Sequence, residues 1–579
     1  MDEQIHPNLT VTIREVLFII MNIYLRHSLT KTALSDILQM INLIFGYKAV
    51  PDSYYQMRPL FDLVGYRKHR LCNECGERLE SATDTCLNCE QSTSYYFISF
   101  DVKTQLQNIL KTHWNSVVQY QNIVNQHTEL CDITNANVVK SKQYDNIVTL
   151  SFNTDGVKVF NSNMRRSLWP IIVTINDLPP KLRFSRKNII VAGLWLNDGE
   201  PDLDIFLKPF CEECKILFDE GIHFDQVHVD SVNITTCCVD TKARCKIQNM
   251  KQFNGYNACS LCMHPGDIVS KQIRYAYKEN IQPRTHTDTL KSMALSHYRG
   301  YDVNGIKGIS PLILIPEFDV VQYCPVDYMH CILLGVCRQL TRIWFEKTDC
   351  PAYIKYCISD IDSMLISIRP FHEISRKARK ITDRHSWKAN EWLHWMLHFS
   401  QICLAICLPP DYFEHYMLLV TAVTNLLQNT ISEDVLVASE QLLDSFIKTF
   451  ESFYGICEMT YNIHLIQHLT SCVRNFGPLW AFSLFTYEDF NGVLKSFVKG
   501  PKEPMLQIAE WFSVNHFMSH TNASSMHPNV NSFCKKMIHH QIITTKLIGQ
   551  FVTLESDGIN EYEICTRYEH RNKFCLNLD

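Results

Sequence analysis

The chain has 579 residues, of which 46% are hydrophobic and 20% charged, so several folding units are expected and no long disordered tail is required. Its net charge of -5 at pH 7 excludes a generally basic protein. Any contact with nucleic acid must therefore come from local clusters of Lys and Arg. The apolar runs near 16–24 and 402–408 are too short to span a bilayer, and the acidic start is unlike a secretory signal. We expect an intracellular protein without a membrane partner.

The first predicted unit is helical and covers residues 1–65. Apolar residues at helical spacing run over 11–24, and a capped second helix begins near Leu29. Such a bundle is more often a packing unit than a DNA-binding head, and we favour packing.

Residues 66–95 are predicted to form a zinc ribbon. The chain has 24 cysteines, eight of them in four C-x-x-C pairs, and the first two pairs lie close together. Four thiolates at this spacing can meet in a tetrahedron around zinc, and Gly76 permits the turn after the first pair. These ligands are Cys72, Cys75, Cys86 and Cys89. The basic run 67–70 before them suits nucleic acid or a solvated face equally.

After a helical linker over 96–145, residues 146–330 are predicted to begin an α/β core. Strand patterns cover 147–153, 157–160, 169–175, 188–195 and 227–239, with a helix over 202–220. Asp155 and Asp240 each follow a strand, where sites in α/β sheets tend to form. Asp155-Gly156 alone is equally a hairpin turn.

A basic helix over 241–251 leads into the isolated pair Cys259 and Cys262. One C-x-x-C pair is half a zinc site and needs remote partners, for which His264, His286 and His330 are candidates. The pair at 211/214 falls inside a predicted helix and is interpreted as core-facing thiols.

Residues 331–470 form a helical pattern with a core of its own. It contains the basic run 376–380 followed by Trp387, Trp392 and Trp395. These residues fit a DNA backbone groove or a charged helix face over a tryptophan core, and the sequence does not decide between them. The core resumes over 471–515, with Glu488 in the first turn of a helix. Residues 516–579 include strand-like pieces such as 550–554 and have no assigned role.

Three groups of motifs together resemble the transposases of CACTA (En/Spm-like) DNA elements in their animal form. The first group is Asn153-Thr154-Asp155-Gly156-Val157, Leu168-Trp169-Pro170 and Leu178-Pro179-Pro180. The second is Val239-Asp240-Thr241-Lys242-Ala243-Arg244, Met250-Lys251-Gln252-Phe253-Asn254-Gly255 and Cys259 to Gly266. The third is Asp327-Tyr328-Met329-His330, Gly477-Pro478-Leu479-Trp480 and Tyr487-Glu488-Asp489-Phe490-Asn491-Gly492. The resemblance covers roughly 145–500, and the motifs are specific only as a set.

This resemblance implies a DDE-type recombinase, in which an RNase H-like core is interrupted by a helical insertion. Asp155, Asp240 and Glu488 would be its catalytic, metal-binding acids, with Asp327 and Asp489 as alternatives for the third. Three carboxylates suit Mg²⁺ or Mn²⁺, and two such ions can cleave and join phosphodiesters.

The resemblance further implies that His330 shares a structural zinc site with Cys259 and Cys262. The expected partners are DNA at the element ends and the target, bound by a homo-oligomer in the nucleus.

The sequence leaves three functional hypotheses. The first is a DNA transposase or transposase-derived nuclease. The second is a domesticated, catalytically silent DNA- or protein-binding factor of the same fold. The third, a zinc-ribbon scaffold for other proteins, leaves the three acids without a role.

Overall fold

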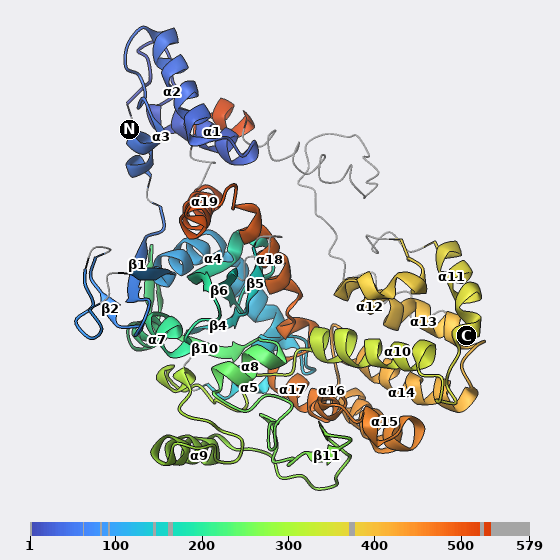
Figure 1. The fold of residues 1–579 in the computed structure, drawn as a ribbon. Helices are drawn as coiled ribbons and strands as arrows, with labels where there is room; N and C mark the ends of the chain where they lie inside the picture. Colours follow the sequence, from blue (N-terminus) through green and yellow to red (C-terminus); the bar gives the residue numbers. More distant parts are fainter. Residues whose placement is uncertain are drawn as a thin grey trace. The chain divides into compact units, whose positions relative to one another are not determined.

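The computed structural model describes residues 3–61, 63–81, 84–90, 93–142, 146–159, 166–369, 377–521 and 526–533. It is a mixed α/β protein with a mixed sheet and many helices (Figure 1). The chain divides into two compact units, one built from 1–114 and 491–561 and the other chiefly from 115–490. Phe160, Arg376 and the segment 550–554, which entered the sequence predictions, lie outside the described residues.

The first unit contains the predicted N-terminal helices. They are α1 (Ile13–Arg26), α2 (Lys31–Phe45), α3 (Tyr54–Met57) and the short η1 (Arg58–Leu60). α1 begins at Thr12, which forms a capping box with Glu15, and α2 ends at Gly46 with φ of 71°. These local signals explain why both helices were visible in the sequence.

A helix from the far end of the chain completes the core of this unit. The ring of Trp511 on α19 (Pro504–His520) stacks on Tyr24 at 4.7 Å, and Glu510 accepts a 2.7 Å hydrogen bond from Arg58 Nε. The sequence pattern predicts that this helix belongs to the core segment 471–515. In the structure it packs with the N-terminal helices instead. α19 presents aromatic residues that match the apolar faces of α1 and α3.

The ribbon of the first unit is an antiparallel sheet in the order β2–β1–β3. Its strands are β1 (Tyr66–Cys72), β2 (Arg78–Leu79) and β3 (Ser94–Phe100). The helix α4 (Val102–Gln126) follows and crosses the division between the units.

The second unit is built on strands in the order β10–β4–β6–β7, with β5 paired to β6. These strands are β4 (Ile147–Thr154), β5 (Val157–Lys158), β6 (Arg166–Ile175), β7 (Ile190–Asp198) and β10 (Ser231–Cys237). β4, β6 and β7 are antiparallel, whereas β10 is parallel to β4. A parallel neighbour requires a crossover, which α7 (Leu203–Glu220) supplies.

The central strands are buried on both faces, and β4 and β10 bury Thr, Ser and Asn residues as well as apolar ones. α7 covers one face, since its Phe206 lies 5.8 Å from Trp195 of β7 and its Phe210 lies 5.2 Å from Phe152 of β4. The other elements of the second unit before residue 329 are η2 (Ile133–Asn135), α5 (Asn137–Lys140), α6 (Pro180–Arg183), η3 (Arg186–Asn188), β8 (Ile222–Phe224), β9 (Val227–Val229), α8 (Thr241–Ile247), β11 (Asp267–Val269), β12 (Gln272–Arg274), α9 (His286–Arg299) and η4 (Pro311–Leu314).

A buried ion pair ties the segment before β4 to the sheet. The Arg183 guanidinium donates two hydrogen bonds, of 2.7 and 2.5 Å, to the Asp132 carboxylate, and both side chains are almost fully buried. Asp177 is buried nearby and accepts hydrogen bonds from Thr149 N and Gln121 Nε2. The C-terminal half of the predicted linker helix is thus packed on the core.

The predicted helical region is present between β10 and the final core helix. It contains η5 (Met329–Cys337), α10 (Arg338–Glu346), η6 (Lys355–Cys357), α11 (Ile358–Ser367), η7 (Ile381–Ser386), α12 (Ala389–His394), η8 (Trp395–Phe399), α13 (Ser400–Leu404), α14 (Pro410–Leu426), α15 (Glu433–Tyr454), η9 (Ile456–Glu458), α16 (Tyr461–Leu465), η10 (Ile466–His468) and α17 (Leu469–Phe476). After it come η11 (Leu479–Phe482) and α18 (Phe485–Ser496). No helix of the described residues is long and apolar enough to cross a membrane.

The tryptophans of this region form a core and not a nucleic-acid groove. The ring centre of Trp387 lies 5.0 Å from that of Trp392 and 5.9 Å from that of Trp395, and all three side chains are buried. Arg379 donates two hydrogen bonds to Glu391, at 2.6 and 3.1 Å. Of the two interpretations of 376–380, these contacts favour the charged face.

A buried histidine makes this helical region sensitive to acid. His415 Nε2 donates to Phe446 O at 3.0 Å, and burial lowers the pKa of His415 from 6.5 to about 4. Because the pKa of His415 is lower in the folded protein than in the unfolded chain, protonation favours unfolding. The contribution of neutral His415 to the free energy of unfolding is complete above pH 6.5 and is lost as the pH falls toward 4. Between pH 7 and 5 we expect the free energy of unfolding to fall by about 2 kcal/mol because of this histidine.

The measurement is urea unfolding at both pH values, followed by tryptophan fluorescence. His415→Gln keeps a donor but cannot titrate, so it should lose about 2 kcal/mol less than the wild type over this range. His385→Gln, at a largely exposed histidine of the same region, is the control and should leave the pH dependence unchanged. Equal pH dependence in all three proteins would contradict the prediction.

Candidate metal centres and acid cluster

The two C-x-x-C pairs of the ribbon converge as predicted. Their four sulfur atoms lie within 4.8 Å of one another, and this set is called the ribbon centre. The Sγ atoms of Cys72 and Cys89 are 3.3 Å apart, and those of Cys75 and Cys86 are 3.4 Å apart. Tetrahedral zinc with bonds of about 2.3 Å separates sulfur atoms by roughly 3.8 Å. The ribbon centre could therefore bind a metal ion such as zinc.

The two knuckles have the same backbone geometry. Gly76 N donates to Cys72 O at 3.0 Å, and Glu90 N donates to Cys86 O at 2.8 Å. Both donor residues, Gly76 and Glu90, have a left-handed backbone conformation, with φ of 72° and 55°. Backbone amides of Cys75 and Glu74 lower the pKa of Cys72 to about 7, which favours the thiolate that binds metal.

A second set of four ligands joins distant parts of the second unit. Cys259, Cys262, His464 and His468 place one ligand atom each within 4.8 Å of one another, and this set is called the bridging centre. Cys259 Sγ lies 3.5 Å from His468 Nε2, and Cys262 Sγ lies 3.4 Å from His464 Nε2. Tetrahedral zinc separates sulfur and nitrogen by roughly 3.6 Å. The bridging centre could bind zinc as well.

The structure corrects the predicted histidine partners of Cys259 and Cys262. His264 uses both ring nitrogens, one toward Ala276 O at 2.8 Å and one accepting from Gly266 N at 3.0 Å. His286 Nδ1 accepts from Val320 N, and His330 Nδ1 lies 2.8 Å from Asp327. The three candidates are therefore engaged elsewhere, and His330 is not a ligand of this centre.

The bridging centre has supporting polar contacts around it. Arg284 Nε donates to Cys259 O at 2.6 Å, and its Nη2 donates to Asn257 O at 2.8 Å. The amide of Gln467 lies 2.9 Å from His464 Nδ1. Such outer contacts fix the loop and the ring that carry the metal ligands.

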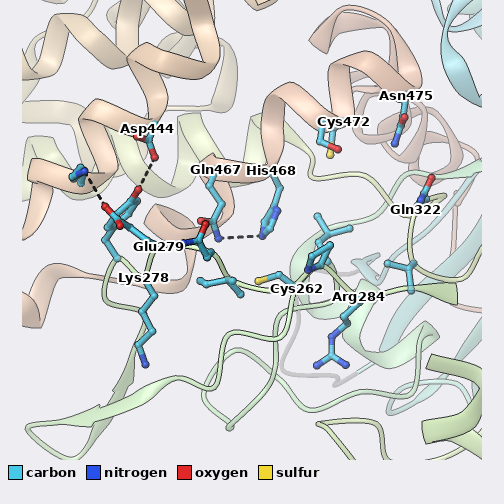
Figure 2. A pocket seen from close by; sticks show the side chains of 18 of the residues that line it. Cys262, Lys278, Glu279, Arg284, Gln322, Asp444, Gln467, His468, Cys472 and Asn475 are labelled. Carbon is cyan, nitrogen blue, oxygen red and sulfur yellow. Dashed lines mark hydrogen bonds and ion pairs between the residues drawn. The ribbon is translucent and has the colours of Figure 1, made fainter. Parts of the chain in front are cut away.

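A cavity of about 610 Å³ opens beside the bridging centre. Figure 2 shows Cys262, Gln467 and His468 on its wall, together with charged side chains from the loop 277–284 and from α15. Two of the four ligands, Cys262 and His468, are thus among the residues that line this cavity.

The remaining C-x-x-C pair contributes to packing. Cys211 and Cys214 are buried within α7, and burial raises the pKa of Cys211 to about 12. Both remain neutral thiols, as the helical pattern predicted.

The first two predicted acids lie beyond the ends of neighbouring strands. β10 is parallel to β4, and Cys237 is in register with Phe152, so both strands end at one edge of the sheet. Asn153 Nδ2 donates to Cys238 O at 2.7 Å and joins the two exits. Asp155 follows β4 directly, and Asp240 caps α8 by accepting from Ala243 N at 2.7 Å.

The third predicted acid comes from α18. Glu488 is in the first turn of this helix, whose Tyr487 OH lies 3.0 Å from Thr174 Oγ1 on β6. Burial, and then the charges of Asp240 and Glu488, raise the pKa of Asp155 to about 7. These three acids, Asp155, Asp240 and Glu488, are called the acid cluster.

Glycine fixes the turn at the first acid. The Asp155 carboxylate accepts from Gly156 N at 2.6 Å. A Cβ at Gly156 would lie 2.7 Å from the Trp169 ring, so a side chain would displace the turn that carries Asp155. Among the described residues, the acid cluster does not gather its oxygens within 4.8 Å as the two cysteine-containing centres gather their ligands.

The alternative third acids have other partners. Asp489 accepts two hydrogen bonds from Arg186, of 2.7 and 2.6 Å. Asp327 is buried and accepts from His330 N and Nδ1, both at 2.8 Å, and from Leu484 N at 3.1 Å. Glu488 N bonds in turn to Leu484 O at 2.9 Å. Asp327 thus connects His330 to the turn that carries Glu488.

His330 brings a positive charge to this site. Burial lowers its pKa, but the hydrogen bond and charge of Asp327, with the charges of Asp240 and Glu488, raise it to about 9. A π-helix begins beside it at Met329, and a Cβ at Gly335 would lie 2.8 Å from His330 O. π-Helical turns often occur at functional sites.

Sequence reasoning missed His464 and His468. The available signal was their spacing of four residues in a helical pattern, which directs both rings to one face. Nothing local linked them to cysteines 202 and 209 residues away.

Comparison with protein families gives one match. Residues 60–297 match a family model described as a protein of unknown function, DUF1258. The matched segment is less than half of the chain and contains the ribbon centre, Asp155, Asp240 and the cysteines of the bridging centre. It ends before Glu488 and the two zinc-type histidines. A search of curated proteins finds no match.

Proposed function

We propose that the protein is a DNA transposase or a transposase-derived protein that cleaves and joins phosphodiesters at the acid cluster. The observation that carries the proposal is that Asp155 and Asp240 follow two adjacent parallel strands at one edge of a buried sheet, while Glu488 lies on a helix that contacts the neighbouring strand β6. Burial raises the pKa of Asp155 to about 7, and the charges of Asp240 and Glu488 contribute in the same direction, as expected for neighbouring acids.

The strand order supports an RNase H-like core, which is the fold proposed for this unit. β4, β6 and β7 form an antiparallel meander, and α7 then returns the chain to β10 beside β4. This connection brings the exits of β4 and β10 together, where two of the acids lie. The long helical region between Asp240 and Glu488 agrees with an insertion in such a core.

The acid cluster fits Mg²⁺ or Mn²⁺ by its chemistry. Carboxylate oxygens are the ligands these hard ions prefer. Burial first, and then the charges of Asp240 and Glu488, raise the pKa of Asp155, and a bound divalent cation would offset these two charges. When bound, two such ions would supply activation of the attacking hydroxyl and stabilisation of the leaving 3′-oxygen. Asp155, Asp240 and Glu488 would hold them.

The two cysteine-containing centres are assigned a structural role. Each offers four protein ligands, which leaves no open position for water or substrate. The proposed substrate implies a nuclear location, and joining two element ends implies a homo-oligomer on DNA.

One observation favours the second candidate, a catalytically silent factor that binds DNA or protein. The acid cluster lacks the close ligand geometry of the two zinc-type centres among the described residues. A domesticated protein could keep the fold and the zinc sites without using the acids.

The deciding experiment is Mn²⁺-dependent nicking and strand transfer on DNA that carries the element ends. We expect activity in the wild type and its loss in Asp155→Asn, Asp240→Asn and Glu488→Gln, with folding and DNA binding retained. Asp489→Asn is the matched control, because this neighbouring acid is engaged by Arg186. Tight DNA binding without nicking by the wild type would favour the silent factor. Activity in the Glu488 variant alone would move the third ligand to Asp489 or Asp327.

A further inference from the structure

Two cations share one face of the ribbon. Lys68 and Arg70 occupy alternate positions on β1, so their side chains leave the same face of the sheet. Arg70 is directly opposite Tyr96 on β3. Lys68 Nζ lies 5.1 Å, and Arg70 Cζ 5.6 Å, from the centre of the Tyr96 ring. The ring orders both cations by cation–π contact.

A loop from the C-terminal part of the same unit adds two more cations. The Tyr96 hydroxyl donates to the Glu503 carboxylate, which anchors the loop 499–503 beside the ribbon. Gln507 shapes the loop by accepting from Lys499 N at 2.7 Å and donating to Lys502 O at 2.6 Å. Lys499 and Lys502 are exposed, and Lys499 Nζ lies 5.9 Å from the centre of the Trp511 ring. The four cations Lys68, Arg70, Lys499 and Lys502 are called the basic face.

No cation of the basic face forms an ion pair within the part of the chain that the structure describes, and the one acid placed beside it, Glu503, accepts a hydrogen bond from the Tyr96 hydroxyl. Exposed Lys48 and Lys291, in contrast, each pair with an aspartate, at 2.5 and 3.0 Å. In a protein of net charge -5, four cations beside the single carboxylate of Glu503 leave a local excess of positive charge that a bound anion would neutralise. The arrangement favours a polyanion.

We propose that the basic face binds the phosphate backbone of double-stranded DNA. Single-stranded nucleic acid is disfavoured because it needs an aromatic ring free to stack on bases. The Tyr96 ring is covered by two cations, and its hydroxyl is bonded to Glu503. Four point charges without a base-reading groove contact phosphates and not sequence. The choice of DNA rests on the proposed function, but the binding does not require catalysis.

The test measures how salt weakens the binding of a duplex of arbitrary sequence. Each phosphate contact contributes about 0.9 to the slope of log K against log [salt]. Replacing Lys68 and Lys502 together by Gln should reduce this slope by about 2 and weaken binding at every sequence equally. The measurement is the fluorescence anisotropy of a labelled duplex titrated with the full chain, at salt concentrations between about 50 and 200 mM and without divalent metal.

The matched control is Lys48→Gln with Lys291→Gln, which removes the same charge from paired positions. A slope equal to that of the control would overturn the proposal. An unchanged DNA slope together with a reduced slope for an A-form RNA duplex would overturn it in favour of RNA. The binding test needs no cleavage. Absence of nicking would therefore contradict the proposed catalytic function, whereas the salt dependence of duplex binding could still be interpreted.

Discussion

Replacing Cys262 with alanine is expected to remove one bound zinc ion per chain and to unfold much of the second unit. The bridging centre joins the loop at 259–262 to His464 and His468, with ligands up to 209 residues apart. Structural zinc in small fingers contributes about 10–16 kcal/mol of apparent binding free energy, comparable to the whole stability of a domain. The helices between these ligands would lose the tie that closes them onto the core.

Zinc content by mass spectrometry, together with thermal unfolding and limited proteolysis, measures this effect. The wild type should carry two zinc ions, and Cys262→Ala should carry one. Cys72→Ala should also carry one but should unfold only the ribbon, whose core is small. Cys214→Ala truncates a buried thiol outside both centres and should keep two ions at a cost of about 1 kcal/mol. Two ions and an unchanged melting temperature in Cys262→Ala would refute the assignment.

Replacing Asp327 with asparagine is expected to destabilise the second unit and to displace Glu488. The Asp327 carboxylate accepts from His330 and from Leu484 N, and an amide cannot serve all of these donors. The pKa of His330 is raised to about 9, so this charge adds stability that is complete below pH 6.5 and lost as the pH rises through 9. Relative to the wild type, the free energy of unfolding of the variant should be lower by about 2 kcal/mol at pH 6 and by less at pH 9.5.

The same variant tests the link between Asp327 and the acid cluster. If Glu488 is moved by about 1 Å, Mn²⁺-dependent nicking should fall by about 10²-fold with DNA affinity unchanged. Hydrogen exchange of the segment 483–490 should increase whether or not the protein is an active nuclease. The control is Asp362→Asn, a buried acid that accepts from Thr382 N and Oγ1 in the helical region. Equal behaviour of the two variants in all three measurements would exclude a positioning role for Asp327.

Local sequence was sufficient where all the partners of a feature are close in the chain. The ribbon centre is contained within 72–89, so the two C-x-x-C spacings alone identified its four ligands. Runs rich in β-branched residues predicted β4 and β10, although both strands also bury Thr, Ser and Asn side chains, and the predicted strand 227–239 is divided between β9 and β10. The position of Glu488 in a first helical turn likewise followed from the local pattern.

Long-range pairing was decided only by the tertiary structure. Cys259 and Cys262 needed two ligands from 24 histidines, and no spacing rule reaches across the helical region to His464. The three histidines nearer in sequence are held by other hydrogen bonds. The same holds for α19, whose ring contacts with α1 assign it to the N-terminal unit.

The sequence by itself identified the ribbon ligands and most strands of the core, and the family resemblance supplied the candidate acids. Only the tertiary structure decided which histidines complete the bridging centre and how Asp327 is used. It also decided that the basic face joins β1 to a loop more than 400 residues away. The physical reason is that periodicity reports which side of an element is buried, whereas the partner of that side depends on how the whole chain closes.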